Sequence, residues 1–370
     1  MIKNIAVLPG DGIGPEIVDE ALKVLDKIKS VFGYEFKIDK YLFGGASIDK
    51  YNEPLIDEVL ENCKKADAIL LGSVGGPKWD NVDKNLRPER GLLKIRKELN
   101  LFANLRPTKL FDCLKDACPI KDDYIKNGID IMMVRELTGG VYFGEKETKI
   151  INGVETAIDK MPYTRTEIER IGRVAFSIAM KRNKKLTSVD KSNVLDTSKL
   201  WRKIMHELAE VYPEVQYEDL LVDNAAMQII KNPSSFDVVV TENMFGDILS
   251  DEASVLAGSI GLMPSASLSD NNFGMYEPIH GSAPDIAGMN IANPIGTILS
   301  LSMMFKYSFD MNEVSDAIDR AVAKVLLDGY RTVDIYTDGK IKLSCSEMGD
   351  KITENIIKLD NISNIKISNI

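Results

Sequence analysis

The sequence has few of the residues on which several classes of site depend. With only two histidines, His206 and His280, a catalytic mechanism centred on histidine has few places to form. The cysteines are also few, and none of them forms the C-x-x-C pair that is typical of zinc and redox sites. We expect reduced thiols, as in a cytoplasmic protein, at Cys63, Cys113, Cys118 and Cys345.

Long apolar runs and an excess of positive charge are absent as well. No apolar run reaches the length of a transmembrane helix, so we expect no membrane partner. The first residues lead directly into a predicted strand without the apolar core of a signal peptide, and we expect no secretory leader. The net charge of −10 argues against nucleic acid as a partner. What remains is the composition of a globular enzyme, with 370 residues for two domains.

The first part of the chain alternates between strand and helix patterns. Apolar runs at 4–8, 34–39 and 68–71 are separated by helical spacing at 15–32 and 54–65. Such alternation predicts an α/β fold with a mainly parallel sheet covered by helices. Further strands are expected at 129–135, 186–190, 218–223 and 237–241, and further helices at 165–182, 198–211, 225–231, 311–328 and 348–358.

Two segments do not fit this alternation. The stretch 141–159 is rich in β-branched residues around Asn152-Gly153, a dipeptide typical of tight hairpin turns, and we predict a β-arm there. The end of the chain at 361–370 is rich in Asn, Ser and Ile and has the composition of a frayed tail.

The most informative stretch is 241–252, which follows an apolar run that indicates a buried strand. Gly246 leads into a helical pattern in which Asp247 and Asp251 stand four residues apart, one turn from each other on the same face. Two carboxylates so placed repel each other unless a cation lies between them, and Mg²⁺ or Mn²⁺ suits oxygen ligands. A solvated helix face is the alternative, but the position just beyond a strand favours a ligand site.

A glycine-rich loop, GDGIG at 10–14, superficially resembles the glycine motif that binds dinucleotides in Rossmann folds. It follows a strand and opens a helix, and Asp39 ends the next strand. The glycines are nevertheless spaced G-x-G-x-G and followed by Pro15, so the glycine that a Rossmann fold needs for close packing of helix and strand is missing. We therefore predict a tight loop at the carboxyl end of the first strand.

Three arginines stand where they can bind an anion. Arg96 and Arg106 flank a short stretch of chain, and Arg135 ends an apolar strand. Because a guanidinium binds a carboxylate through two parallel N–H groups, three of them together can hold a substrate with two carboxylates. A single arginine is more often a surface residue, and the position at a strand end favours a role for Arg135 most strongly.

Three further polar residues are candidates for the chemistry. Tyr142 lies in a glycine-rich segment and can donate a proton, whereas Lys191 follows a buried strand and can accept one near a metal. Asp223 ends a predicted strand and is either a third metal carboxylate or the N-cap of the next helix. The alternatives for Tyr142 and Lys191, an aromatic core residue and a solvated lysine, stay open on these grounds.

The segment 277–288 is dense in glycine, proline and small residues. A loop of this composition lets a ligand approach the backbone closely. His280 within it can stack on a base or hydrogen-bond to it, or it can be a structural histidine with satisfied hydrogen bonds.

Taken together, these segments resemble the β-decarboxylating dehydrogenases, the family of isocitrate and 3-isopropylmalate dehydrogenases. The motifs run in family order along nearly the whole chain, at 8–16, 87–106, 134–136, 189–194, 243–251 and 277–293. The resemblance implies an isocitrate/isopropylmalate dehydrogenase-like α/β fold with two interleaved domains, one formed by 1–103 and 259–370 and the other by 104–258. It also implies a non-Rossmann NAD site and a homodimer to which the β-arm at 141–159 contributes.

The resemblance also implies roles for the candidate residues. The carboxylates of a malate would be held by Arg96, Arg106 and Arg135. One Mg²⁺ or Mn²⁺ per subunit would be bound, together with oxygens of the substrate, by Asp223, Asp247 and Asp251. Tyr142 would be the general acid, and Lys191 would be the general base that takes the proton of the substrate hydroxyl. Three residues would reach the site from the partner subunit, namely Lys191, Asn193 and Asp223.

For NAD, the resemblance implies a place along the loop after 277 and beside 76–89, away from the loop at 10–14. The residues that would contact it are Gly76, Glu89, Glu277, His280, Gly281, Ser282, Ala283, Pro284, Asp285, Ile286 and Asn293. Asp285 resembles the family's marker for NAD, because its carboxylate can accept hydrogen bonds from a ribose and would repel the 2′-phosphate of NADP.

The residues around the γ-substituent of the substrate decide among the family's activities. Leu92 and Leu93, with Val194 from the partner subunit, suit an isopropyl group, while Glu89 would repel the γ-carboxylate of isocitrate. We therefore expect oxidation of 3-isopropylmalate in leucine biosynthesis; D-malate, tartrate and homoisocitrate are the alternatives. Arg90 stands where the family usually has a small residue and could partly offset Glu89.

A different class of function is a non-catalytic regulatory subunit, as occurs among relatives of isocitrate dehydrogenase. Such a subunit is expected to lack Tyr142, Lys191 or one of the aspartates. All of them are present, so an active enzyme is favoured.

Overall fold

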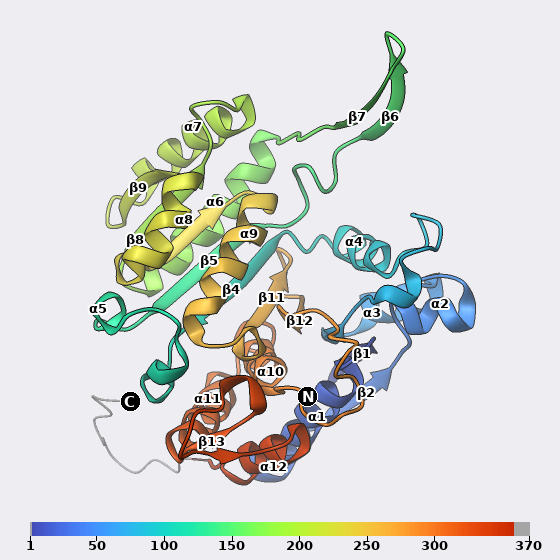
Figure 1. Cartoon of the computed structure of the whole chain (residues 1–370), viewed down its shortest axis with the longest axis vertical. Helices are drawn as coiled ribbons and strands as arrows, with labels where there is room; N and C mark the ends of the chain where they lie inside the picture. The colour runs from blue at the N-terminus through green and yellow to red at the C-terminus, as the bar shows by residue number, and fades with distance from the viewer. Residues whose placement is uncertain (1, 359–370) are drawn as a thin grey trace.

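The computed structural model describes residues 2–358 and is built around one ten-stranded sheet (Figure 1). Its strands are β1 (Lys3–Gly10), β2 (Phe36–Lys40), β3 (Ala68–Ser73), β4 (Ala103–Lys109), β5 (Asp130–Glu136), β8 (Lys185–Asp190), β9 (Gln216–Leu221), β10 (Val238–Thr241), β11 (Pro264–Leu268) and β12 (Gly274–Pro278). In space they follow the order β2-β1-β3-β12-β11-β4-β5-β10-β8-β9. The tail predicted at 361–370 lies outside the described residues.

Helices pack against this sheet, which confirms the predicted α/β class. They are α1 (Gly14–Phe32), α2 (Gly45–Tyr51), α3 (Asp57–Lys65), α4 (Pro88–Glu98), α5 (Asp122–Ile125), α6 (Arg165–Lys181), α7 (Asp196–Val211), α8 (Val222–Lys231), α9 (Asn243–Ser254), α10 (Ile295–Tyr307), α11 (Asn312–Leu327) and α12 (Cys345–Glu354). Within residues 2–358, no helix is long and apolar enough to cross a membrane.

The sheet is mainly parallel, as predicted, with an antiparallel stretch at its centre. β4 pairs antiparallel with β5 and with β11, and β11 pairs antiparallel with β12. The strands β4, β11 and β12 were not predicted, because β4 alternates polar residues such as Asn104 and Arg106 with apolar ones, while β11 and β12 are short and contain serine, glycine and proline. Alternation along β4 places Asn104 and Arg106 on the same face of the sheet.

The continuous sheet joins the two predicted domains. The residues assigned to the first domain supply β2, β1, β3, β12 and β11, and those assigned to the second supply β5, β10, β8, β9 and all of β4 except Ala103. The two halves meet where β11 pairs with β4. The division into domains at 103/104 and 258/259 stays a prediction.

The central helix α10 was not predicted from the sequence. Nearly all residues of α10 are buried, and the helix packs against β11, β12 and α11. A helix that is buried on all sides has no polar face, so it shows no 3.6-residue repeat. Two of its buried hydroxyls are satisfied inside the protein: Ser300 donates to the Gly296 carbonyl and Ser302 to the Asp319 carboxylate.

The β-arm predicted at 141–159 is present as a hairpin of β6 (Lys146–Ile151) and β7 (Val154–Asp159) that projects from the body (Figure 1). Asn152 and Gly153 both have positive φ, as a two-residue turn of this kind requires. The hairpin exposes apolar side chains on Ile150 and Val154. An arm with uncovered apolar residues is consistent with the predicted role in joining two subunits.

Two predictions about Asp223 are wrong. The strand expected at 218–223 is β9, which ends at Leu221, so Asp223 lies in the first turn of α8 and not at a strand end. The N-cap position of α8 is Leu221, which also excludes Asp223 as the N-cap.

The start of α9 also differs from the prediction. The helix begins at Asn243 instead of after Gly246. The cause is Glu242, whose carboxylate accepts hydrogen bonds from the backbone N–H groups of Met244 and Phe245 and so caps the helix earlier.

Replacing one aromatic side chain of α10 tests its place in the core. Phe305 is fully buried, and its ring packs edge-on against Phe36 and Phe309. Phe305→Ala leaves a cavity, so we expect the free energy of unfolding to fall by about 3–5 kcal/mol. Urea denaturation followed by circular dichroism measures this loss, with Leu327→Ala at an exposed position as the control. A small and equal loss in both variants would contradict a tightly packed α10.

Candidate active site

A cleft of about 430 Å³ opens beside α4, α9 and the loop after β12, where β3, β5 and β12 end. Many of the predicted site residues line it: Glu89, Leu92, Leu93, Arg96, Arg106, Arg135, Tyr142, Asp247, Glu277, His280 and Gly281. Residues that are far apart in the sequence are thus brought together by one end of the sheet, as expected for a ligand site in an α/β protein.

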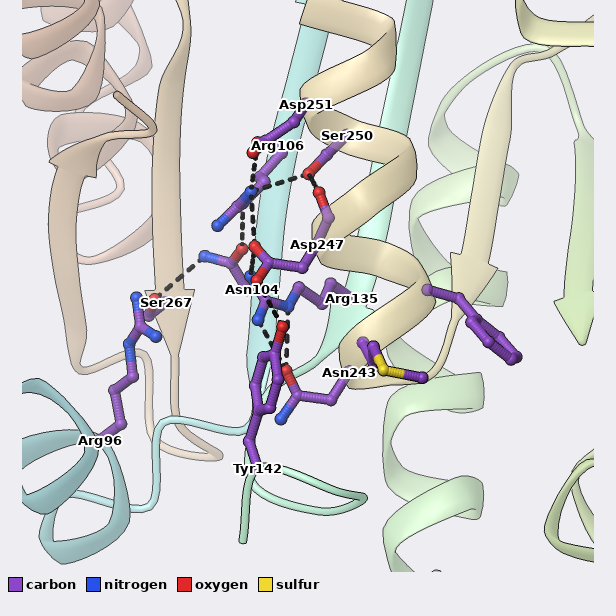
Figure 2. Close-up of polar contacts among 12 residues, drawn as sticks. Arg96, Asn104, Arg106, Arg135, Tyr142, Asn243, Asp247, Ser250, Asp251 and Ser267 are labelled. Atoms are coloured by element: carbon purple, nitrogen blue, oxygen red, sulfur yellow. Dashed lines mark hydrogen bonds and ion pairs between the residues drawn. The ribbon is translucent and has the colours of Figure 1, made fainter. Parts of the chain in front are cut away.

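Arg106 projects from β4 and is buried. Its Nε donates to Asn104 Oδ1 at 2.8 Å, and its Nη1 donates to Ser250 Oγ on α9 at 2.7 Å (Figure 2). Asn104 is itself fixed, because its amide donates to Ser267 Oγ at 3.0 Å. The guanidinium is therefore held from both sides in one orientation.

Arg135 projects from the neighbouring strand β5 and is held in the same manner. Its Nε and Nη2 donate to Asn243 Oδ1 at 3.0 and 2.7 Å, and its Nη1 lies 2.5 Å from Asp247 Oδ1 (Figure 2). Asn243 also donates from Nδ2 to the carbonyl of Gly139, in the segment that leads to Tyr142. One buried amide thus connects the arginine with the tyrosine loop.

Arg96 approaches the cleft from α4, across from the other two arginines. Its Nη2 is 2.9 Å from Glu277 Oε1, while its Nε is buried and has no hydrogen-bond partner among residues 2–358. A buried N–H group without an acceptor costs free energy, so this group is available to a ligand that brings an oxygen.

The electrostatics of the cleft favour an anionic ligand. Burial, and then the neighbouring charge of Arg106, lower the pKa of Arg135 to about 9. The pKa of Arg106 is lowered as well, again first by burial. Burial would raise the pKa of Asp247, but the charges of Arg135 and Arg106 outweigh it and hold that pKa below its ordinary value. A second negative charge from a ligand would stabilise both guanidinium groups further.

Tyr142 reaches the cleft from the loop after β5. Its hydroxyl donates to Asp247 Oδ2 at 2.9 Å. Burial, and then the charge of Asp247, raise the pKa of Tyr142 to about 12, so the hydroxyl keeps its proton at neutral pH and can give it away. The loop is anchored by the buried Glu136 carboxylate, which accepts hydrogen bonds from the N–H groups of Thr138 and Gly139.

The two acids of α9 lie close to the same arginine. Arg106 Nη1 is 3.4 Å from Asp247 Oδ1 and 3.4 Å from Asp251 Oδ1. Burial and the neighbouring Asp247 raise the pKa of Asp251, as expected for two carboxylates at close range. Two carboxylate oxygens on one helix face are suitable ligands for Mg²⁺ or Mn²⁺.

The third predicted metal ligand is not brought to this cleft by the same chain. Asp223 is exposed and forms an ion pair with Lys191. No group of three His, Cys, Asp or Glu side chains suited to a metal occurs within residues 2–358. Neither Asn193 nor Val194 lines the cleft, and the Val194 side chain is 64% exposed. These four residues form a separate group at the ends of β8 and β9, away from the arginines.

The predicted cofactor residues follow the loop out of the cleft. His280 Nδ1 lies 2.9 Å from the Gly281 carbonyl, and its Nε2 is buried without a partner among the described residues. Burial lowers the pKa of His280, so the ring is neutral and Nε2 can accept a hydrogen bond. Beyond the cleft lie Gly76, Ser282, Ala283, Pro284, Asp285, Ile286 and Asn293.

Several cleft residues were not predicted. Lys146 and Ser265 line the cleft, and the two amides that orient the arginines were quoted only as parts of motifs. Recognition of β4 as a strand would have placed Asn104 beside Arg106, since residues two apart share a face. Arg90 is not among the residues that line the cleft, and its Nε donates to the Lys84 carbonyl; its effect on Glu89 stays a prediction.

Removing the Asn243 amide tests how the cleft is built. Asn243→Ala leaves two buried N–H groups of Arg135 without an acceptor, so we expect the free energy of unfolding to fall by about 1–3 kcal/mol. Urea denaturation measures the loss, and Asn312→Ala, at an exposed asparagine, is the control. Unchanged stability of Asn243→Ala would show that Arg135 finds another acceptor.

Comparison with known proteins identifies the family. Residues 4–352 match the family model described as isocitrate/isopropylmalate dehydrogenase. Relatives named 3-isopropylmalate dehydrogenase include one from Aquifex aeolicus, 57% identical over 96% of this chain and 98% of its own length, and one from Clostridium pasteurianum, 54% identical over 95% and 99%.

Solved structures agree with this assignment. An isocitrate dehydrogenase from Methylococcus capsulatus has a TM-score of 0.83 and 34% identity, covering 96% of this chain and 99% of its own. A β-decarboxylating dehydrogenase from Thermococcus kodakarensis has a TM-score of 0.77 and 36% identity, covering 96% of both chains. The chain therefore belongs to the isocitrate/isopropylmalate dehydrogenase family, as its motifs predicted.

Proposed function

We propose that this enzyme catalyses the NAD-dependent oxidative decarboxylation of 3-isopropylmalate to 4-methyl-2-oxopentanoate and CO₂, a step of leucine biosynthesis. The observation that carries the proposal is the cluster of three buried arginines beside Asp247, in which Arg96 Nε lacks an acceptor. Such a cluster suits a substrate with two carboxylates next to a cation. The similarity to relatives named 3-isopropylmalate dehydrogenase, at 54–57% identity, supports the same activity.

The arginines would bind and orient the substrate. Asn104 and Asn243 occupy the Nε groups of Arg106 and Arg135, so these arginines present their remaining N–H groups to the malate carboxylates. Asp247, Asp251 and Asp223 of the partner subunit would hold a divalent cation, which would supply the charge that polarises the substrate carbonyl, and bound NAD would supply the hydride acceptor.

Lys191 and Tyr142 would carry out the proton transfers of the reaction. Lys191 would take the proton of the substrate hydroxyl as hydride leaves carbon. Tyr142, whose hydroxyl reaches the cleft and hydrogen-bonds to Asp247, would deliver a proton to carbon after CO₂ is lost. Since the cleft of one chain lacks Lys191 and Asp223, we propose that both come from the partner in a homodimer.

The γ-substituent would contact Leu92 and Leu93 on α4, which line the cleft together with Glu89. A branched alkyl group gains from contact with the leucines, whereas a carboxylate would meet the like charge of Glu89 in the cleft. D-malate, tartrate and homoisocitrate would fit this environment less well. Asp285 would favour NAD over NADP, because its carboxylate would repel the 2′-phosphate of NADP. We also expect a cytoplasmic location.

The substrate and metal assignments can be tested together. Purified enzyme is assayed for NAD reduction with 3-isopropylmalate and Mg²⁺, beside D-malate, isocitrate and an NADP control. We expect strong turnover only with 3-isopropylmalate and NAD, loss on addition of a chelator, and recovery on addition of Mg²⁺ or Mn²⁺. Preference for D-malate or isocitrate would keep the mechanism and overturn the proposed contacts of Leu92, Leu93 and Glu89.

The shared site can be tested by mixing two inactive variants. Tyr142→Phe and Lys191→Met each remove one proton-transfer group, so each homodimer should lose activity by roughly 100-fold or more. In mixed dimers one site carries both substitutions and the other carries neither, so random mixing restores about a quarter of the sites. Activity after co-expression, compared with each variant alone, measures this; no recovery would mean that Lys191 serves its own chain.

A further inference from the structure

The glycine-rich loop at 10–14 resembles a phosphate-binding fingerprint, but its acidic side chain is fully engaged with backbone. The Asp11 carboxylate is 4% exposed and accepts three hydrogen bonds of 2.8 Å. Two come from Gly45 and Ala46 at the start of α2, and one comes from Gly75 after β3. No oxygen of Asp11 is therefore left for a phosphate or a ribose, and a carboxylate would repel a phosphate in any case.

The same loop holds a third segment through its backbone. The N–H of Ile13 donates to the Ser282 carbonyl at 2.8 Å, and Ser282 Oγ donates to the Gly75 carbonyl at 2.7 Å. A Cβ on Gly12 would lie 2.0 Å from the Ser282 carbonyl oxygen, so only glycine allows this close approach. Hydrogen bonds thus connect each of three segments to the other two: the loop at 10–14, the segment at Gly75 and the segment at Ser282.

Two of these segments carry residues to which the cofactor is assigned above. Gly75 precedes Gly76, and Ser282 lies at the start of the loop that includes Asp285. We propose that Asp11 is a positioning residue for the dinucleotide, because it holds the 75–76 segment and, through its own loop, the 282–286 segment at a fixed separation. This inference rests on the proposed NAD site and goes beyond it by giving the Asp11 carboxylate a role in holding the two cofactor segments in place.

Asparagine at this position provides a sharp test. An amide has one acceptor oxygen, so Asp11→Asn turns the other oxygen into an N–H₂ group that faces backbone N–H donors. At least one of the three backbone hydrogen bonds to Asp11 is lost, and the N–H₂ group repels the backbone donor that it faces, which loosens the loop while the cleft arginines are untouched. We expect KM for NAD and the calorimetric Kd for NAD to rise roughly ten-fold or more, with KM for 3-isopropylmalate within about two-fold of wild type.

Asp67→Asn is the matched control on the same two strands. Asp67 precedes β3 and accepts a hydrogen bond of 2.7 Å from the backbone N–H of Asn4 in β1, at the opposite ends of these strands from Asp11. Loss of this carboxylate should leave both KM values unchanged. Equal rises in both KM values of Asp11→Asn, or no rise in either, would overturn the proposal, because a general weakening of the fold does not separate the two ligands.

A second variant keeps the test decisive if Asp11→Asn does not fold. Gly12→Ala leaves the carboxylate in place and pushes on Ser282, so KM for NAD should again rise alone. Gly33→Ala is its control, since Gly33 has the same sign of φ, +75°, and open space around a Cβ. Wild-type turnover is measured in parallel: a wild type that binds no NAD overturns both proposals, whereas normal wild-type kinetics with unchanged variants overturns only this one.

Discussion

The structure of the cleft depends on the burial of two guanidinium groups side by side. Arg106 and Arg135 project from adjacent strands beneath α9, where burial and mutual repulsion disfavour their charges. Such groups persist in a protein only if hydrogen bonds and carboxylates surround them. Asn104, Asn243 and Asp247 fulfil this need, and this explains why strand alternation, the cap of α9 and the tyrosine loop all converge on the same place.

The same constraint accounts for the mixed sheet. The antiparallel direction of β4 decides which residues of β4 and β5 lie side by side, while alternation keeps Asn104 and Arg106 on one face. The antiparallel pair β4–β5 brings Asn104 opposite Arg135 and Arg106 opposite Met133. Both arginines then face α9, whose Asp247 and Ser250 are one turn apart and reach them. The antiparallel pairing of β4 with β5 therefore positions the arginines of the site.

The sequence allowed most of the cleft to be predicted because the chemistry is carried by charged residues at strand ends and one helix turn. The parts that were missed have identifiable reasons. Asn104 and Asn243 are neutral amides whose importance lies in the groups they orient, and the spacing of Asn104 from Arg106 is informative only once β4 is recognised as a strand. α10 lacks a polar face, and Asp223 lies beyond the end of β9 because α8 begins at once. The loop at 10–14 was correctly separated from a Rossmann site by spacing, but its internal contacts required coordinates.

The hydrogen bonds of Asp247 would couple the binding of substrate to the binding of the proposed cation. Its two oxygens bind Arg135 Nη1 and the Tyr142 hydroxyl, so a cation must compete with both. A substrate carboxylate that takes over the N–H groups of Arg135 removes one of these competitors and frees an oxygen of Asp247. The cation would then bind more tightly when the substrate carboxylate is bound, because it no longer competes with Arg135 for that oxygen. By thermodynamic linkage, the cation would increase the affinity for the substrate by the same factor. The ion pair between Arg135 and Asp247 thus contributes to the order of the cleft, and under the proposed mechanism it would couple binding of the substrate to binding of the cation.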